Sequence, residues 1–324
     1  MMRILSGIQP SGELHIGNYF GALKNFVELQ DSHEGFFMIA DLHALTVPST
    51  PKELQNNIKH VMRMFLAIGL TPEKSALFIQ SHVPQHTELA TILATLTPIG
   101  ELERMTQYNE KARKHKNSVN AGLLNYPVLQ AADILLYGVA SVPVGEDQLQ
   151  HLELTHTLAR KFNKAFGKTL IEPKAMMQKT AERILSLQDP QKKMSKSLGP
   201  QHSIFILEDE ASIRDKIKRA ITDSESTISY DPKKRPAISN LVTLFSLASG
   251  MSTDQVVEKY KDKGYATFKN ELADALIAIL SPIKERYKKL TDKEVDMAFK
   301  SGESKAKKEA EKTMQMVRKR DGLI

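Results

Sequence analysis

Two short stretches of the chain, far apart in sequence, combine residue types that can bind phosphate. The first, at residues 15–18, reads His-Ile-Gly-Asn and follows an apolar segment and a loop with glycine and proline. The second, at residues 192–197, reads Lys-Lys-Met-Ser-Lys-Ser. Because ammonium, imidazole and hydroxyl groups donate hydrogen bonds to phosphate oxygens, both stretches favour a ligand that carries phosphate.

The first stretch is predicted to consist of a strand, a loop and a helix. Residues 4–8 suit a strand, and the helix is expected to bury one face at helical spacing, made of Tyr19, Ala22, Leu23, Phe26 and Val27. This arrangement aims unpaired backbone N–H groups and the positive end of a helix at phosphate. Gly17 would let a ligand approach the backbone, with the His15 imidazole at the helix start. The alternative is an ordinary strand–helix connection with a surface histidine.

Strands and helices alternate in the following segment. Residues 35–40 and 76–79 are apolar runs typical of buried parallel strands. Between them, Thr50 and Glu53 predict a capping box for a helix that ends near Gly69. The alternation predicts an α/β fold with a doubly wound parallel sheet. His43 follows the first of these strands, at the end where such sheets bind ligands, although taken alone it fits a hydrogen-bonded core histidine better.

An acidic residue, Asp133, interrupts an apolar helix predicted at residues 121–137. A buried carboxylate without a partner is costly, so Asp133 must find a hydrogen-bond donor. A structural ion pair would satisfy it. A carboxylate that only accepts is also what an indole N–H, which only donates, would select. Tyr126 lies seven residues earlier and therefore on the same helical face.

Two further charged segments have ordinary explanations. Residues 100–122 hold a basic cluster that is usually a solvated face. A strand is expected at residues 139–144 and an amphipathic helix before Gly167, so that Glu146 and Asp147 would be first-turn acids. After Met176, apart from the apolar run at residues 204–207, the pattern is typical of successive helices.

Composition limits the class of protein. The chain has 324 residues, a net charge of +7 and no cysteine, which excludes disulfides and thiolate metal sites and favours a polyanionic partner. No apolar run is long enough for a membrane span, and no signal peptide is expected. From residue 281 onward, thirteen Lys and Arg face eight Asp and Glu. This surplus on helices fits RNA binding, but it also fits simple solubility.

The order of the two phosphate-type stretches resembles that in the class I aminoacyl-tRNA synthetases. Five other stretches are similar to the bacterial tryptophanyl-tRNA synthetase family: residues 7–12, 17–19, 41–46, 100–105 and 145–148. The resemblance runs from Ile4 to about Asp321. It implies ATP-dependent, AMP-forming activation of L-tryptophan and transfer to tRNA(Trp), with Mg²⁺ held mainly by the ATP phosphates and no dedicated metal site.

The resemblance also implies an organisation. A Rossmann-like catalytic domain is expected at 1–176, with an insertion at about 100–122 that contributes to a homodimer interface. A helical anticodon-binding domain with the lysine-rich loop is expected at 177–300, and a C-terminal helix at 301–324 that packs back on the catalytic domain. A cytoplasmic enzyme without membrane or DNA partners is expected.

Site residues follow from the matching motifs. The catalytic residues implied are His15, Lys111, Lys193 and Lys196. The ATP-binding residues implied are Gln9, Pro10, Ser11, Gly17, Asn18, Gly145, Glu146, Asp147, Ile184, Lys193, Met194, Ser195, Lys196 and Ser197. The tryptophan-binding residues implied are Gln9, His43, Tyr126, Asp133, Val142, Val144 and Gln148.

The chain departs from the family pattern at a few positions. Asn18 replaces the usual final histidine of the first motif, as suits this subfamily. Leu5, Ala40 and Gln130 stand where larger or more apolar pocket residues are usual. Two rivals share much of the pattern: a tyrosyl-tRNA synthetase, which normally has a pocket tyrosine where this chain has Leu5, and an inactive paralogue that binds nucleotide or RNA.

Overall fold

The computed structural model describes residues 1–114, 119–145, 148–177 and 184–324, with the side chains of residues 110, 111, 113, 114 and 177 left out. The contacts of the chain divide it into two compact units. Unit 1 comprises Met1–Gly12, Phe26–Gln178 and Thr291–Ile324, and unit 2 comprises Glu13–Asn25 and Lys179–Leu290. The domain bounds expected from the sequence stay a prediction.

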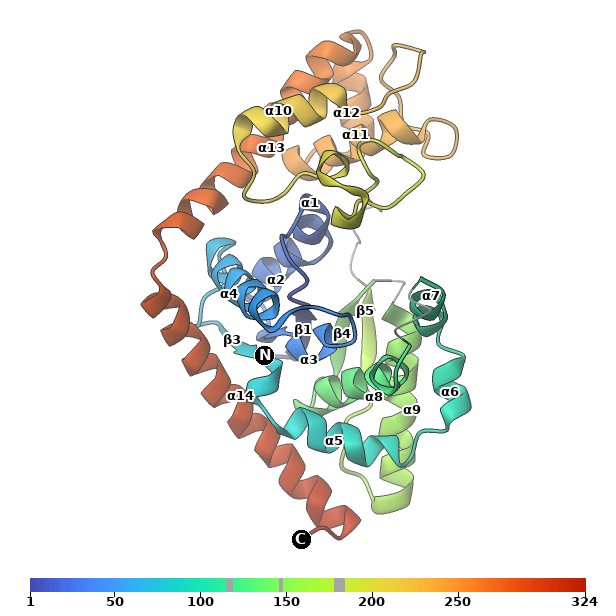
Figure 1. The fold of residues 1–324 in the computed structure, drawn as a ribbon, viewed down its shortest axis with the longest axis vertical. Helices are drawn as coiled ribbons and strands as arrows, with labels where there is room; N and C mark the ends of the chain where they lie inside the picture. Colours follow the sequence, from blue (N-terminus) through green and yellow to red (C-terminus); the bar gives the residue numbers. More distant parts are fainter. Residues whose placement is uncertain (115–118, 146–147, 178–183) are drawn as a thin grey trace. The chain divides into compact units, whose positions relative to one another are not determined.

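Unit 1 is built on parallel strands (Figure 1). β1 (Arg3–Ile8), β2 (Glu34–Ile39) and β3 (Ser75–Ile79) form one parallel sheet in that order. β4 (Ser141–Val144) and β5 (Lys174–Met177) pair in parallel as a second sheet, and β4 lies next to β1. The spatial order β3-β2-β1-β4-β5 is that of a doubly wound fold, which confirms the predicted fold class. The almost entirely buried β2 and β3 suit a sheet that is covered on both faces.

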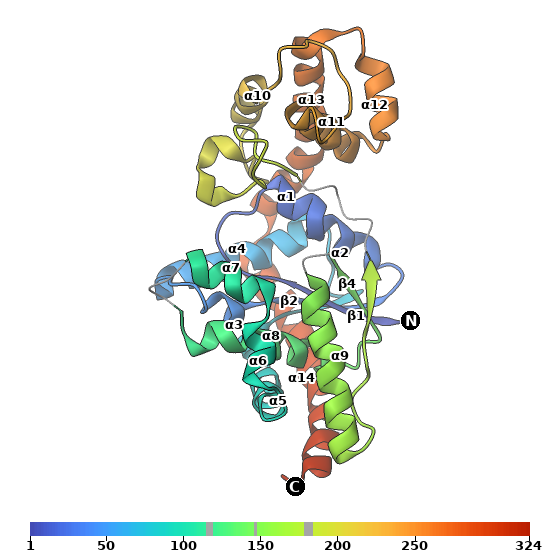
Figure 2. The ribbon, with the colours of Figure 1, turned by 90° about the vertical axis from the view of Figure 1, so that its right-hand side faces the viewer.

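The helices of unit 1 surround these strands. They are α3 (Asp41–Ala44), α4 (Pro51–Ala67), α5 (Gln85–Ala94), α6 (Ile99–Glu103), α7 (Thr106–Lys114), α8 (Ala121–Leu136), α9 (Leu149–Phe166) and α14 (Asp292–Asp321), with the short 3-10 turn η2 (Gln80–His82) after β3. The predicted capping box of α4 is confirmed, because Thr50 and Glu53 bond to each other's backbone N–H. α8 packs against α5 and α9 (Figure 2), which fixes the helix that carries Asp133.

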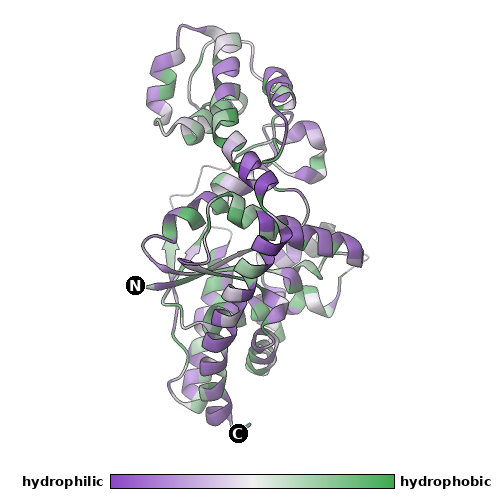
Figure 3. Ribbon diagram, turned by 90° about the vertical axis from the view of Figure 1, so that its left-hand side faces the viewer, coloured by the Kyte–Doolittle hydropathy of each residue, from purple (hydrophilic) through white to green (hydrophobic). Residues whose placement is uncertain are grey.

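The C-terminal helix α14 packs on β3, the edge strand of the first sheet. A Cβ at Gly302 would lie 2.1 Å from the backbone oxygen of Leu77, so only glycine allows this approach. Arg318 holds the far end of α14 with a two-pronged ion pair to Glu88 of α5, at 2.6 and 2.7 Å. Hydrophilic and hydrophobic residues alternate along α14 (Figure 3), as expected for a helix with one buried stripe.

Unit 2 is mainly helical. Its longer helices are α10 (Glu210–Arg219), α11 (Pro236–Ser249), α12 (Thr253–Tyr260) and α13 (Gly264–Lys289). Its N-terminal segment holds α1 (Ile16–Asn18), the π-helical turn η1 (Tyr19–Leu23) and the start of α2 (Lys24–Leu29), and two 3-10 turns follow one another, η5 (Lys196–Leu198) and η6 (Pro200–His202). Phe245, Tyr260 and Phe268 form an aromatic core between α11, α12 and α13.

The buried face expected after His15 is only partly confirmed. The buried residues after His15 are Ile16, Phe20, Leu23 and Phe26, whereas Tyr19, Ala22 and Val27 are only half-buried. Leu23 and Phe26 are therefore confirmed on the buried face, and the segment between His15 and α2 includes a π-helical turn at Tyr19–Leu23. The apolar run at residues 204–207 forms an isolated bridge between Phe205 and His15. None of the described helices is long and apolar enough to cross a bilayer.

Candidate active site

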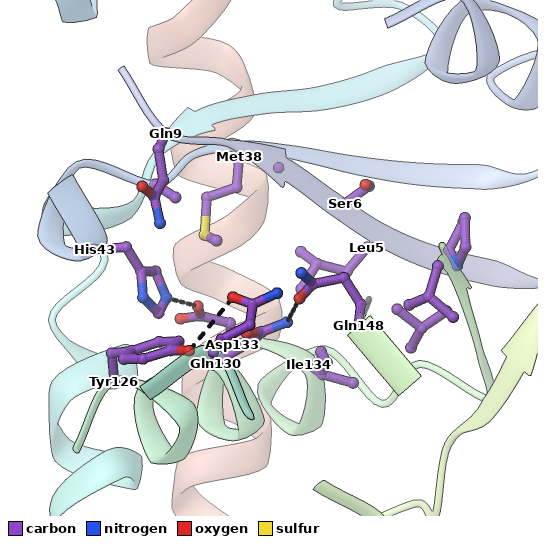
Figure 4. A pocket seen from close by; sticks show the side chains of 16 residues that line it. Leu5, Ser6, Gln9, Met38, His43, Tyr126, Gln130, Asp133, Ile134 and Gln148 are labelled. Atoms are coloured by element: carbon purple, nitrogen blue, oxygen red, sulfur yellow. Dashed lines mark hydrogen bonds and ion pairs between the residues drawn. The ribbon is translucent and has the colours of Figure 1, made fainter. Parts of the chain in front are cut away.

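A cavity of about 320 Å³ opens in unit 1 where β1 and β4 lie next to each other (Figure 4). The chain turns from one half of the doubly wound fold to the other at this point, which is where such folds bind ligands. The apolar part of the wall consists of Leu5, Met38, Ala40, Ile134, Val142, Pro143 and Val144. The polar part consists of Ser6, Gln9, His43, Gln107, Tyr126, Gln130, Asp133 and Gln148, and Gly7 completes the lining.

Asp133 is the charged group of this cavity and is almost fully buried. His43 Nε2 lies 2.8 Å from Asp133 Oδ2, and His86 Nδ1 lies 2.6 Å from Oδ1. Gln80 Nε2 donates to both oxygens, at 2.8 and 2.9 Å. Burial opposes ionisation of this carboxyl, but the nearby imidazoles of His86 and His43 outweigh it and hold the pKa of Asp133 well below its usual range. The expectation that Asp133 finds donors is therefore confirmed.

Four of the remaining polar side chains of the cavity, Gln107, Tyr126, Gln130 and Gln148, are held by hydrogen bonds. Tyr126 Oη lies 2.9 Å from His151 Nε2 and 3.4 Å from Gln107 Oε1. Gln130 Nε2 donates to Gln148 Oε1 at 3.1 Å, which ties α8 to the start of α9. These contacts fix the polar groups before any ligand binds, so the cavity is preorganised.

All seven residues implied as tryptophan-binding line this one cavity, together with the three departures Leu5, Ala40 and Gln130. They come from β1 and the loop after it, the residue after β2, α3, α8, β4 and the residue before α9, so the fold brings together residues more than 140 positions apart. The sequence analysis missed Gln80 and His86. Gln80 directly follows the predicted third strand, and a polar residue at that strand end was the available signal.

The His15 motif lies in unit 2, where residues 14–16 run antiparallel to residues 204–206. Ile16 N–H donates to the Ile204 carbonyl and Ile206 N–H to the Leu14 carbonyl, both at 2.9 Å. His15 caps α1, with its Nδ1 accepting from Gly17 N–H at 3.1 Å. Burial first, and then the charges of Lys193 and Lys196, lower the pKa of His15 to about 4. Since Nδ1 is an acceptor, the neutral ring carries its proton on Nε2, where it can donate to an anion.

The backbone around His15 departs from the expectation in one respect. The N–H groups of Ile16, Gly17, Asn18 and Tyr19 already have acceptors inside the chain. The helix start therefore does not present the unpaired N–H groups that were expected, because the His15 ring and carbonyl and the paired segment satisfy them. Glycine is needed at position 17 for the histidine itself, since a Cβ there would lie 2.8 Å from two atoms of the His15 ring.

The lysine-rich segment at residues 192–197 belongs to the same unit. Residues 184–186 pair with residues 192–194 through bonds that include Met194 N–H to the Ile184 carbonyl at 3.0 Å. Buried Met194 anchors the segment, while Lys193, Lys196 and Ser197 are exposed. Ser195 and Ser197 hydroxyls lie 2.9 Å apart. The loop is thus fixed at its base and presents ammonium and hydroxyl groups to solvent.

The chain was compared with known proteins. A family model described as tRNA synthetases class I (W and Y) matches residues 1–281. The chain belongs to this family. It is 50% identical to tryptophan–tRNA ligase from Caldanaerobacter subterraneus subsp. tengcongensis, over 100% of the chain and 99% of that protein. It is 46% identical to the Helicobacter pylori enzyme of the same name, over 99% of each.

Solved structures of tryptophanyl-tRNA synthetases are similar in fold to this chain. The tryptophanyl-tRNA synthetase from Mycoplasma pneumoniae superposes with a TM-score of 0.91 at 35% identity, covering 99% of this chain and 98% of that one. The Campylobacter jejuni enzyme, solved with ADP and tryptophan, gives a TM-score of 0.84 at 35% identity over 99% and 100% of the two chains.

The other site residues expected of a class I synthetase have different placements. Gln9 lines the cavity, Pro10 is buried and Ser11 is exposed in the loop after β1. Gly145 follows β4 and is half-buried. Glu146 and Asp147 lie outside the described residues. The backbone of Lys111 lies in α7, but its side chain is outside the described part. In the described ranges no group of acidic or histidine side chains is placed to hold a metal ion.

Proposed function

We propose that this chain is a tryptophan–tRNA ligase that works in two steps. In the first, a carboxylate oxygen of L-tryptophan attacks the α-phosphorus of ATP, the bond to the β-phosphate breaks, and pyrophosphate leaves. In the second, a terminal ribose hydroxyl of tRNA(Trp) attacks the acyl carbon of tryptophanyl-adenylate, and AMP leaves. Positioning and charge neutralisation do most of the work in phosphoryl transfer, so no nucleophilic side chain is required.

One observation carries the amino-acid assignment: the buried, ionised Asp133 in a cavity whose wall includes a large apolar part. Indole is an apolar bicyclic ring with a single N–H donor, and a carboxylate supplies only acceptors. We assign the amino group of the substrate to Tyr126, which lines the same cavity. His43, Val142, Val144, Gln9 and Gln148 are proposed as the remaining tryptophan contacts.

Phosphate binding is assigned mainly to residues of unit 2, with Lys111 of unit 1. Neutral His15, with its proton on Nε2, can donate to a phosphate oxygen, and the exposed ammonium groups of Lys193 and Lys196 neutralise charge as pyrophosphate departs. Ser195 and Ser197 donate further hydrogen bonds, and Lys111 is proposed as an additional phosphate ligand. Mg²⁺ is expected to be bound by ATP phosphates and water, as is usual for this ion.

Partners and location are part of the proposal. The helical unit 2 is proposed to contain the anticodon-binding surface, and the α6–α7 region to contribute to a homodimer interface. Support comes from exposed apolar Ile99 at the start of α6. We expect the enzyme to act in the cytoplasm.

Amino-acid-dependent exchange of labelled pyrophosphate into ATP tests the proposal. We expect exchange with tryptophan and little with tyrosine at equal concentration. Faster exchange with tyrosine would identify a tyrosine enzyme, and no exchange with either would identify an inactive paralogue. Charging of purified tRNA(Trp), measured with the same preparation, then tests the second step.

A further inference from the structure

Behind the cavity, Asp133 rests on a buried polar chain that no part of the proposed reaction uses. Gln80 and His86 are fully buried and do not line the cavity, so neither can touch a ligand bound there. Both bond to Asp133, and Tyr137 continues the chain from the other side of His86. These three side chains can act on a ligand only through Asp133.

The carboxylate sets the direction of the first hydrogen bond in this chain. An ionised carboxylate only accepts, so His86 must carry a proton on Nδ1, which lies 2.6 Å from Asp133 Oδ1. In the neutral ring, Nε2 is then an acceptor and takes the hydroxyl proton of Tyr137 at 2.8 Å. Burial, together with the nearby Asp133 charge, raises the pKa of Tyr137, so its hydroxyl remains a donor. In its neutral form, His86 is therefore held in the tautomer with the proton on Nδ1.

Gln80 bonds to Asp133 through its amide nitrogen and leaves its own amide oxygen unpaired among the described residues. Its Nε2 reaches both carboxylate oxygens, and its Oε1 is buried. Gln30, another buried glutamine, uses both ends of its amide: Nε2 donates to the Gly69 carbonyl at 2.9 Å and Oε1 accepts from Thr71 N–H at 3.1 Å. An unpaired buried carbonyl is costly, and turning the Gln80 amide would place that carbonyl against the carboxylate.

The carboxylate is thereby divided into two unequal oxygens. Among the described residues, Oδ1 is engaged by His86 and Gln80, both away from the cavity wall. Oδ2 is engaged by Gln80 and by His43, and His43 lines the cavity. Of the two oxygens, Oδ2 is thus the one with a donor on the cavity side.

We propose that Gln80, His86 and Tyr137 are positioning residues that hold the Asp133 carboxylate in one orientation, with Oδ2 as the acceptor of the substrate's ring N–H. This inference rests on the proposed use of tryptophan. The titratable groups that face Asp133 are His43 from α3 and His86 from α5, with Tyr137 behind His86. Removing His86 takes away a donor to Asp133 and a nearby imidazole, so the carboxylate becomes easier to protonate and a poorer acceptor in acid.

The test compares His86→Leu with His86→Asn in pyrophosphate exchange. The asparagine amide can replace the Nδ1–H donor, whereas leucine cannot. For His86→Leu we expect kcat/KM for tryptophan to fall about 10- to 100-fold, the range for losing a bond to a charged group, with the KM for ATP unchanged. The KM for tryptophan should also rise as the pH falls into the acid range, although the wild-type value stays flat. His86→Asn should recover most of the affinity and the flat profile.

Gln80→Leu and Gln30→Leu form a matched pair that separates positioning from stability. Each removes a buried amide, but only Gln80 touches Asp133. We expect Gln80→Leu to reduce discrimination against a benzothienyl analogue of tryptophan, in which sulfur replaces the ring N–H, while Gln30→Leu leaves that ratio unchanged. Tyr137→Phe retains His86 but removes its bond to the Tyr137 hydroxyl. We expect this variant to show a weaker form of the rise in KM for tryptophan at acid pH.

The outcomes are distinguishable from those of the proposed function. If the wild-type enzyme shows no tryptophan-dependent exchange, the proposed function fails. If it does exchange, but the folded variants at His86, Gln80 and Tyr137 keep the wild-type pH profile and analogue ratio, only the positioning role is overturned. Equal losses for Gln80→Leu and Gln30→Leu would also overturn it, because they would reflect stability alone.

Discussion

The cavity of unit 1 and the phosphate-type residues of unit 2 are built in opposite ways. The cavity has one negative group, Asp133, which is buried. The side chains of His43, Gln80 and His86 are hydrogen-bonded to its carboxylate. Unit 2 places two positive groups, Lys193 and Lys196, on an exposed loop held at its base by the buried Met194. The first arrangement suits discrimination between similar uncharged rings, and the second suits neutralisation of a charge that changes during the reaction.

The largest effect should come from Asp133→Asn. The amide keeps the size of the side chain but presents a donor where the site needs an acceptor, and it leaves several buried donors facing it. We expect kcat/KM for tryptophan to fall by about 10³-fold or more, with ATP affinity nearly unchanged. Equilibrium titration of each substrate separately measures the two affinities. Equal losses of affinity for tryptophan and for ATP would contradict the proposed difference between the two regions.

Lys196→Ala should show the complementary pattern. Removing one donor that acts in the transition state typically lowers a rate by about 10²–10³-fold, so adenylate formation should slow by that factor while tryptophan binding persists. Single-turnover adenylate formation is the measurement. Lys192→Ala is a suitable control in the same segment, since Lys192 pairs with Asp189 at 2.7 Å. A Lys196 variant within a few-fold of wild type would show that this loop does not carry the chemistry.

The sequence was sufficient for the regular parts of both regions, and insufficient for the contacts between distant segments. Apolar runs identified β1 to β4, and the Thr50–Glu53 capping box and Gly69 placed α4 well. The three donors to Asp133 lie 47 to 90 positions away from it, so only the folded chain reveals them. The buried face after His15 was only partly anticipated, and the pairing of the Ile16 N–H with the Ile204 carbonyl joins segments too far apart to be predicted.

His15 gives a prediction about stability rather than rate. Its pKa is lowered to about 4 in the folded chain, from an ordinary value of 6.5. Between these two pH values the unfolded chain binds a proton that the folded chain does not, so stability is lost as the pH falls through this window. For His15→Asn, which keeps a cap but cannot titrate, we expect about 2 to 3 kcal/mol less loss between about pH 7 and about pH 4.5.

Urea unfolding of wild type and His15→Asn at both pH values measures this difference. A His33→Asn variant controls for loss of a histidine, because His33 is in unit 1 and bonds to Ser32. If wild type and His15→Asn lost the same stability on acidification, His15 would not be held neutral by its surroundings.

The smallest effect is expected from the basic C-terminal helix, outside both regions. Lys305 pairs with Glu34 at 3.0 Å and Lys312 with Glu309 at 2.5 Å, so these lysines have acidic neighbours already. We expect that replacing Lys307 and Lys308 by alanine leaves the salt dependence of tRNA binding unchanged, because α14 mainly packs on β3. Two lost phosphate contacts would instead flatten the slope by about 1.4 to 1.8. The Lys305 and Lys312 double variant is the matched control.

The division of roles between the two units is tested most directly by the binding of tryptophan itself. The chain contains no tryptophan, so fluorescence excited beyond tyrosine absorption comes only from the ligand. Titration of wild type, Asp133→Asn and Lys196→Ala should show saturable binding to the first, greatly weakened binding to the second and wild-type binding to the third. Retained binding by Asp133→Asn together with lost binding by Lys196→Ala would contradict the account.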